Sequence, residues 1–224
     1  MANREHISLL KSSIERWNIW RESYPKIKPD LDRVDFNGIN LKKANLRRAN
    51  FHMALLNGTN FQGADLTKTF FSGSDLRGAN LNETDCSAAK FHGADLDGCS
   101  FKKAMLRKVD FSNFDLRGID FSETDLRKAD FRKSNLEKAN LFRADLRKTL
   151  FTEANLREAY LSSTWLQDTD LQWANLRKAI LRYSVNLTPA QIQSAEIDRE
   201  TKVPHYLKIH WTSETDFRCE EKIE

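Results

Sequence analysis

The sequence predicts an all-β solenoid, a parallel β-helix of about seven to eight coils with short α-helical caps at its N- and C-terminal ends. Three observations predict it. Leu or Phe recurs every five residues from Leu31 to Leu181 except at Cys86, a small residue stands two positions before most of them, and Phe recurs every twenty residues from Phe51 to Phe151. A period of five matches neither an α-helix nor a β-strand, so each five-residue unit must bend.

Each unit combines a small residue, an Asp or Asn and a large apolar residue, as in Ala64, Asp65 and Leu66. We expect the large and the small residue to point inward from a short extended piece. The Asp or Asn between them supports the following turn through its short side chain. Successive coils then pair as parallel ladders.

The spacing of phenylalanines indicates how many units close one coil. Stacked coils should place like residues above one another, and steps of twenty from Phe51 meet Phe at every position to Phe151, whereas a step of fifteen meets Leu66 and Leu81. Four units per coil is the consistent interpretation. The aromatic wall of the core, here called the Phe column, comprises Phe51, Phe71, Phe91, Phe111, Phe131 and Phe151.

The ends of the chain differ from the repeats and divide the sequence into residues 1–30, 31–186 and 187–224. Residues 3–23 carry apolar residues at helical spacing, including Leu10 and Trp17, which predicts one amphipathic helix that caps the first coil. Thr188 and Pro189 are a suitable start for a second capping helix, which we expect to run to about Glu196. Residues 201–212 are apolar enough to pack, and the acidic tail after them should fray.

The A(D/N)LXX pattern over residues 31–186 resembles that of the pentapeptide-repeat family. The resemblance implies a right-handed quadrilateral β-helix. The stretches WNIWRESYP and KPDLDRVDFNGINLKKANL resemble leaders of cyanobacterial members of that family.

Basic residues stack at two neighbouring outward positions. One column has Arg47, Arg107, Arg127 and Arg147, and the next has Arg48, Lys68, Lys108, Lys128 and Lys148. Such a stripe would attract an acidic protein or a phosphate backbone, and the attraction should weaken with salt. The alternative is a solvated face whose charges are offset by the adjacent Asp125 and Asp145.

Apolar residues also replace the outward Asp or Asn near the C-terminal end of the repeats, most clearly at Tyr160, Trp165 and Ile180. Two interpretations are open. Residues 197–212 would fold back and cover them, or they would form a partner or dimer surface. The candidate partner surface therefore comprises Arg107, Lys108, Arg127, Lys128, Arg147, Lys148, Tyr160 and Trp165.

No catalytic, cofactor-binding or metal-binding motif is found in the sequence, and we expect no enzyme and no cofactor. Cys86 and Cys99 fall at inward positions, where cysteine acts as a small apolar residue. The three cysteines do not suggest a secreted disulfide framework, and no segment resembles a signal peptide or membrane span. These features predict a cytoplasmic protein with reduced thiols.

A scaffold or regulator that presents a flat face to an unidentified protein partner is the function best supported by the sequence. The resemblance suggests an alternative, since the best-known family members mimic DNA and protect gyrase from quinolones. Mimicry requires a strongly acidic surface, but this chain has 36 Lys and Arg against 32 Asp and Glu. Direct nucleic-acid binding through the stripe should be weak. The sequence leaves the pathway open, and monomer and dimer both remain open.

Overall fold

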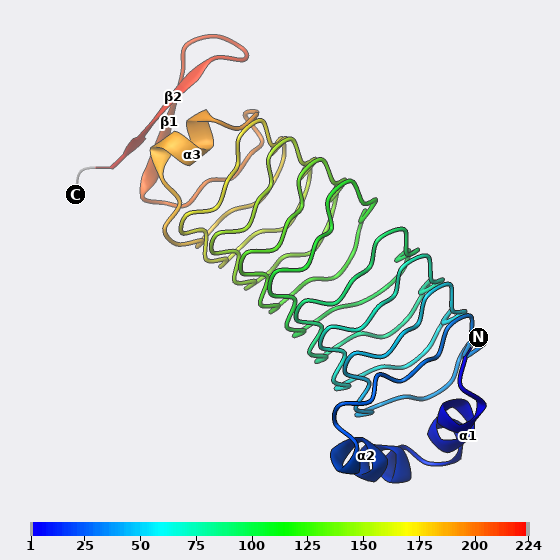
Figure 1. Ribbon diagram of the computed structural model, residues 1–224. Helices are drawn as coiled ribbons and strands as arrows, with labels where there is room; N and C mark the ends of the chain where they lie inside the picture. The colour runs from blue at the N-terminus through cyan, green and yellow to red at the C-terminus, as the bar shows by residue number, and fades with distance from the viewer. Residues whose placement is uncertain (1, 223–224) are drawn as a thin grey trace. The chain divides into compact units, whose positions relative to one another are not determined.

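The computed structural model describes residues 2–222. The chain forms two compact units, of which the first ends at Asp110 and the second begins at Phe111. Each unit contains a stack of repeat coils (Figure 1).

Parallel bridges between residues twenty positions apart hold the coils together in both units, for example Asp30 with Asn50 and Asp125 with Asp145. Around each bridge the main chain bonds in both directions along the stack. The Leu31 N–H donates to the Asn50 carbonyl at 2.8 Å, and the Leu55 N–H donates to the Val34 carbonyl at 2.9 Å. A coil therefore contains four five-residue units, and the chain is a parallel β-helix built from bridges of single residues.

A hydrogen-bonded turn follows most bridges of the repeats. In the first, the Val34 N–H donates to the Leu31 carbonyl, and Arg33 has a φ of 55°. Positive φ at the third turn position is the geometry of a type II turn. The Asp or Asn before the turn accepts from the N–H two residues later, as Asp65 Oδ1 does from Thr67 at 2.9 Å. This is the turn-supporting role that the sequence predicts for these residues.

The interior of each unit is filled by the large residue of every repeat, and every member of the Phe column is at most 1% exposed. In the first unit Phe71 stacks on Phe51 and Phe91 with ring centroids 5.4 and 5.2 Å away. In the second, Phe131 stacks on Phe111 at 5.3 Å and on Phe151 at 5.2 Å. Cys86 and Cys99 are also buried.

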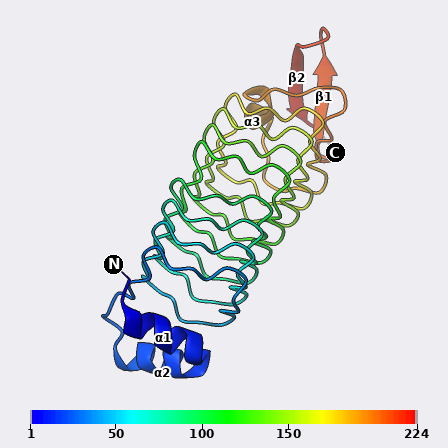
Figure 2. The ribbon, with the colours of Figure 1, turned by 90° about the vertical axis from the view of Figure 1, so that its right-hand side faces the viewer.

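The N-terminal segment contains two helices, α1 (Arg4–Ser12) and α2 (Ile14–Ser23), so the prediction of a single helix was wrong (Figure 2). The break lies at Ser13, which is extended at φ −166° and whose hydroxyl accepts from the Arg16 N–H. Ser12 bonds back to the Leu9 carbonyl. A pair of serines that compete for main-chain groups explains why the helix restarts there.

Side chains of α2 bond the main chain of the first coils. The Trp17 indole N–H donates to the Asn45 carbonyl at 2.8 Å, and Asn18 accepts from the Asn45 N–H and donates to the Lys43 carbonyl. Trp17 is fully buried. These contacts pair main-chain groups that would otherwise form an open sheet edge.

Helix α3 (Pro189–Gln193) begins with a capping box between Thr188 and Gln191 and ends earlier than predicted. Glu196, which the prediction included in the helix, instead forms a parallel bridge with Asn175. This bridge continues the ladder of the preceding coil. The ladder bonds available to Glu196 compete with another helical turn.

The C-terminal residues form an antiparallel hairpin of β1 (Leu207–Trp211) and β2 (Phe217–Glu221), so the prediction of a frayed tail was wrong. Leu207 and Cys219 are buried, and the Trp211 and Phe217 rings lie 5.4 Å apart. Alternating apolar residues in the tail, together with cross-strand pairing, explain why this charged segment is ordered.

Candidate binding surface

Two Asp–Arg pairs form a ladder on the second unit. Arg127 donates two hydrogen bonds to the Asp125 carboxylate, from Nε at 2.9 Å and from a terminal nitrogen at 2.7 Å. Arg147 donates to Asp145 in the same way, at 2.8 and 2.6 Å. Arg127 Nε also lies 3.4 Å from Asp145. The side-chain hydrogen bond to its Asp is the first cause of a raised pKa for each of the two arginines.

The sequence left open whether neighbouring carboxylates offset the charge of the basic stripe, and the ladder shows that they do at two arginines. The charges of Arg127 and Arg147 are offset by carboxylates in bidentate geometry, the strong form of this interaction. Lys128 and Lys148 stay exposed on the following turn position, both with φ near 60°. Arg107 and Lys108 belong to the first unit, and Lys108 is exposed there. In the second unit, therefore, the exposed charge of the stripe comes mainly from lysines.

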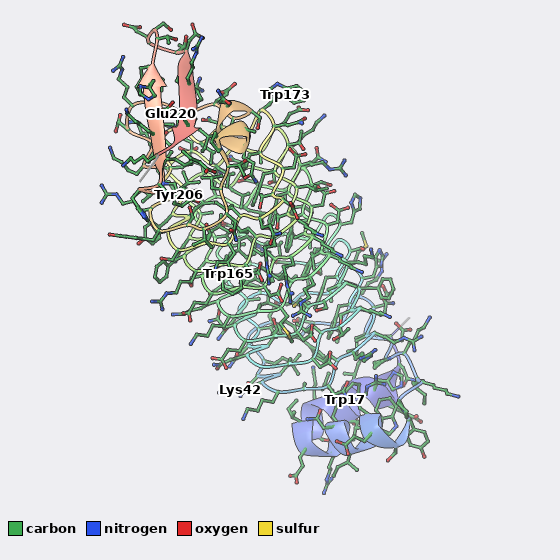
Figure 3. The ribbon with its side chains drawn as sticks, turned by 90° about the vertical axis from the view of Figure 1, so that its left-hand side faces the viewer. Trp17, Lys42, Trp165, Trp173, Tyr206 and Glu220 are labelled. Carbon is green, nitrogen blue, oxygen red and sulfur yellow. The ribbon has the colours of Figure 1, made fainter. Side chains whose placement is uncertain are left out.

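Aromatic side chains continue this surface. Trp165, labelled in Figure 3, is 49% exposed. The centroid of its ring lies 4.9 Å from the Arg147 guanidinium carbon. Tyr160 is 41% exposed and stacks on Phe142, with ring centroids 5.6 Å apart. The guanidinium of Arg143 lies over the Phe142 ring, 4.9 Å from its centroid. Arg143 was not singled out from the sequence, although its place beside an outward Phe was an available signal.

The fold-back of residues 197–212 does not cover Tyr160 and Trp165. Lys202 pairs in parallel with Ile180, which is half-buried, and the segment reaches no further along this column by main-chain pairing. Val185, rather than the tail, pairs with Trp165. The covering interpretation was therefore wrong for the two aromatic residues, which remain accessible.

Family models match most of the repeat region. Residues 66–141 and 84–161 match a pentapeptide repeat region, and residues 30–63 and 154–184 match pentapeptide repeats in eight copies. The chain belongs to the pentapeptide-repeat family. The resemblance read from the sequence is thereby confirmed.

Solved structures of pentapeptide-repeat proteins are similar to this one. QnrB1, a plasmid-mediated fluoroquinolone resistance protein, is 18% identical in a trypsin-treated variant form, with a TM-score of 0.50 over 76% of this chain and 87% of that chain. HetL, involved in heterocyst differentiation regulation in Nostoc sp. strain PCC 7120, is 23% identical. That match covers 84% of this chain and 93% of HetL, with a TM-score of 0.30. The likeness to QnrB1 shows the fold alone. No curated protein matches the chain significantly.

Metal-binding and nucleophilic groups are the other features that bear on the chemistry of this pentapeptide-repeat protein. Within residues 2–222, no group of three or more His, Cys, Asp or Glu side chains is placed to hold a metal ion. Burial raises the pKa of the Cys86 and Cys99 thiols to about 12, which disfavours the nucleophilic thiolate. No helix in the same range is both long and apolar enough to cross a membrane.

Proposed function

We propose that this pentapeptide-repeat protein is a non-enzymatic scaffold or regulator that binds a protein partner through the second unit. The observation that carries the proposal is the exposure of Trp165, whose ring lies against Arg147, and of Tyr160, which stacks on Phe142. Trp, Tyr and Arg are the residues most enriched among energetically important interface positions. Exposed apolar side chains rimmed by polar residues mark interaction surfaces.

The ladder supports the proposal because it fixes side chains before a partner arrives. Arg147 is held by two bonds to Asp145 and lies over the Trp165 ring. A side chain already fixed loses little conformational entropy on binding, a cost of about 0.5–1.5 kcal/mol for a mobile one. Trp165 is thereby presented on a pre-organised base, with Lys148 available for the acidic rim of a partner.

The finer architecture belongs to the same proposal. We infer a right-handed β-helix of about seven to eight coils over residues 31–186, with capping segments at 1–30 and 187–224. We propose that the protein acts in the cytoplasm and needs no cofactor. The partner is a protein, whereas attraction to nucleic acid is limited to weak contacts through lysines such as Lys128 and Lys148.

Affinity capture from the lysate of the source organism tests the proposal, with the wild type compared with Trp165→Ala and Trp173→Ala. Trp173 is 65% exposed on a turn of the same unit and serves as the matched control. We expect one protein to be retained at moderate salt by the wild type and by Trp173→Ala, and to be lost with Trp165→Ala. Equal retention by both variants, with unchanged unfolding midpoints, would remove Trp165 from the interface.

A DNA-mimicking topoisomerase interactor is the alternative that this surface does not favour. The ladder pairs each Asp with an Arg, so its carboxylates do not present the acidic face that mimicry requires. Protection of gyrase from a quinolone at low protein concentration would overturn this preference.

A further inference from the structure

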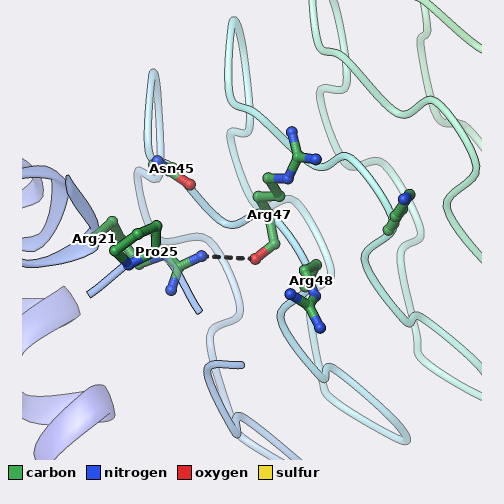
Figure 4. Close-up of a pocket in the computed structure, with 6 residues that line it drawn as sticks. Arg21, Pro25, Asn45, Arg47 and Arg48 are labelled. Carbon is green, nitrogen blue, oxygen red and sulfur yellow. Dashed lines mark hydrogen bonds between the residues drawn. The ribbon is translucent and has the colours of Figure 1, made fainter. Parts of the chain in front are cut away.

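A basic pocket of about 610 Å³ lies in the first unit beside α2 (Figure 4). Its lining residues are Arg21, Pro25, Asn45, Arg47, Arg48 and Lys68. Four of the six are cationic and none is acidic. The pocket is separate from the surface formed by Tyr160 and Trp165, which lies in the second unit.

Arg21 is the buried element of the pocket and is only 2% exposed. One terminal nitrogen donates to the Ile27 carbonyl at 2.7 Å, and the other donates to the Arg47 carbonyl at 3.0 Å. Its Nε is buried without a hydrogen-bond partner, as is Oδ1 of Asn45. Held by two neutral carbonyls in a partly desolvated site, Arg21 has no carboxylate of the described residues in direct contact, and Asp65 offsets its charge only without an ion pair.

The surrounding cations add to this imbalance. Arg47 and Lys68 are exposed and Arg48 is half-buried, and within residues 2–222 none of the four basic side chains forms an ion pair. Burial is the main cause that lowers the pKa of Arg21; Arg48 and Arg47 lower it further, while Asp65 raises it. Like charges gathered around one pocket repel each other, and a bound anion would relieve that repulsion.

Comparison with equivalent turns shows why Arg47 is available. At five turns the Arg at this position forms an ion pair with the Asp two residues before it: Asp75–Arg77, Asp115–Arg117, Asp125–Arg127, Asp130–Arg132 and Asp145–Arg147. Two residues before Arg47 stands Asn45, which has no charge to offer. The local pattern that closes these five pairs therefore leaves Arg47 open.

We propose that this pocket binds a phosphate group, either as inorganic phosphate or as part of a small phosphorylated metabolite. Guanidinium groups match the tetrahedral oxyanion by charge-assisted hydrogen bonds, often in bidentate form. The unpaired Oδ1 of Asn45 accepts from the hydroxyl of a monoprotonated phosphate, a role that a fully ionised anion does not offer. Arg21 supplies the fixed positive charge at the base, and Arg47, Arg48 and Lys68 supply the outer donors.

Isothermal titration at low ionic strength tests this proposal with three probes: inorganic phosphate, pyrophosphate and glycerol 3-phosphate. Phosphate binding with one site per chain is expected, and it should weaken with added chloride. Tighter binding of glycerol 3-phosphate than of phosphate would identify a metabolite as the occupant, and the reverse order would identify the free ion. Acetate that binds as well as phosphate, or no binding of any probe at millimolar concentration, would overturn the proposal.

Matched variants locate the site. Arg47→Gln/Arg48→Gln should weaken phosphate binding about tenfold or more, whereas Lys42→Gln/Lys43→Gln should change it less than about twofold. The control lies one repeat unit earlier, removes the same charge and occupies the same two turn positions, with φ of 59° at Lys43 and 62° at Arg48. Equal losses in the two double variants would mean that only net charge matters and would refute the site.

A third variant adds the missing carboxylate. Asn45→Asp is expected to pair with Arg47 as Asp125 does with Arg127, and thus to abolish phosphate binding without lowering the unfolding midpoint. Arg21 itself is left unchanged in these tests because its bonds to the carbonyls of Ile27 and Arg47 tie α2 to the segment that follows it and to the coils. Phosphate affinity that survives Asn45→Asp in a folded protein would contradict the proposed role of Arg47.

Discussion

Phe131→Ala probes whether the Phe column stabilises the stack. Phe131 is fully buried and stacks on Phe111 and Phe151 at 5.3 and 5.2 Å. Removal of the ring forfeits roughly 1.5–3 kcal/mol of burial and about 0.5–1.5 kcal/mol for each stacked pair. It also leaves a cavity, because coils tied by hydrogen bonds on both sides cannot collapse fully around it. The expected loss in free energy of unfolding is about 3–5 kcal/mol.

Guanidinium denaturation followed by circular dichroism measures this loss, provided that several probes give coincident transitions. Phe131→Leu is a milder change, since Leu171 fills the same column, and should cost less than about 1.5 kcal/mol. Phe142→Ala, at a partly exposed ring, serves as the surface control and should cost about 1 kcal/mol or less. A loss below about half a kcal/mol for Phe131→Ala, or equal losses at Phe131 and Phe142, would refute the argument.

Three further predictions concern turns, acid stability and thiols. Gly58→Val should destabilise by about 1–2 kcal/mol in the same denaturation assay because φ is +64°, although nothing lies within 4 Å of an added Cβ; Gly58→Asn should cost less. Hydrogen bonds from Arg132 lower the pKa of folded Asp130, so this pair stabilises above the unfolded pKa of about 3.9 and its contribution is lost on acidification below it. Arg132→Gln should therefore reduce the fall in unfolding free energy between about pH 5 and 2; an unchanged acid profile would count against the pair. Cys86 and Cys99 should resist a thiol reagent at neutral pH until denaturant is added, and rapid labelling of the native protein would contradict their burial.

The core was predictable because the spacing of like residues in the sequence equals the number of residues in one coil. The spacing of Phe51 and Phe71 gives the length of a coil, and the observed bridges within residues 30–185 join residues separated by that same twenty positions. Asp or Asn before each turn also had a local role that could be read without the structure, as Asp65 illustrates. Both features depend on contacts whose sequence separation is fixed by the repeat.

The ends were less predictable because their structure depends on partners outside the repeat. Apolar spacing over residues 3–23 indicated helix but not the break at Ser13, which follows from hydrogen bonds of two serine hydroxyls. The tail looked polar enough to fray, yet cross-strand contacts between Trp211 and Phe217 order it. The pocket was missed for the same reason, since only the packing of α2 brings Arg21 beside Arg47.

A basic residue in the sequence does not always leave a positive charge free to bind a ligand, because a neighbouring carboxylate can pair with it. The basic stripe read from the sequence contains Arg47 and Arg127 at equivalent positions. Asp125 holds the guanidinium of Arg127 in two hydrogen bonds, whereas Asn45 leaves that of Arg47 without a carboxylate. One amide in place of one carboxylate, two residues before the arginine, therefore separates the proposed protein-binding surface from the proposed anion-binding pocket. If Asn45→Asp removes phosphate binding while Trp165→Ala removes only partner capture, the two sites act independently.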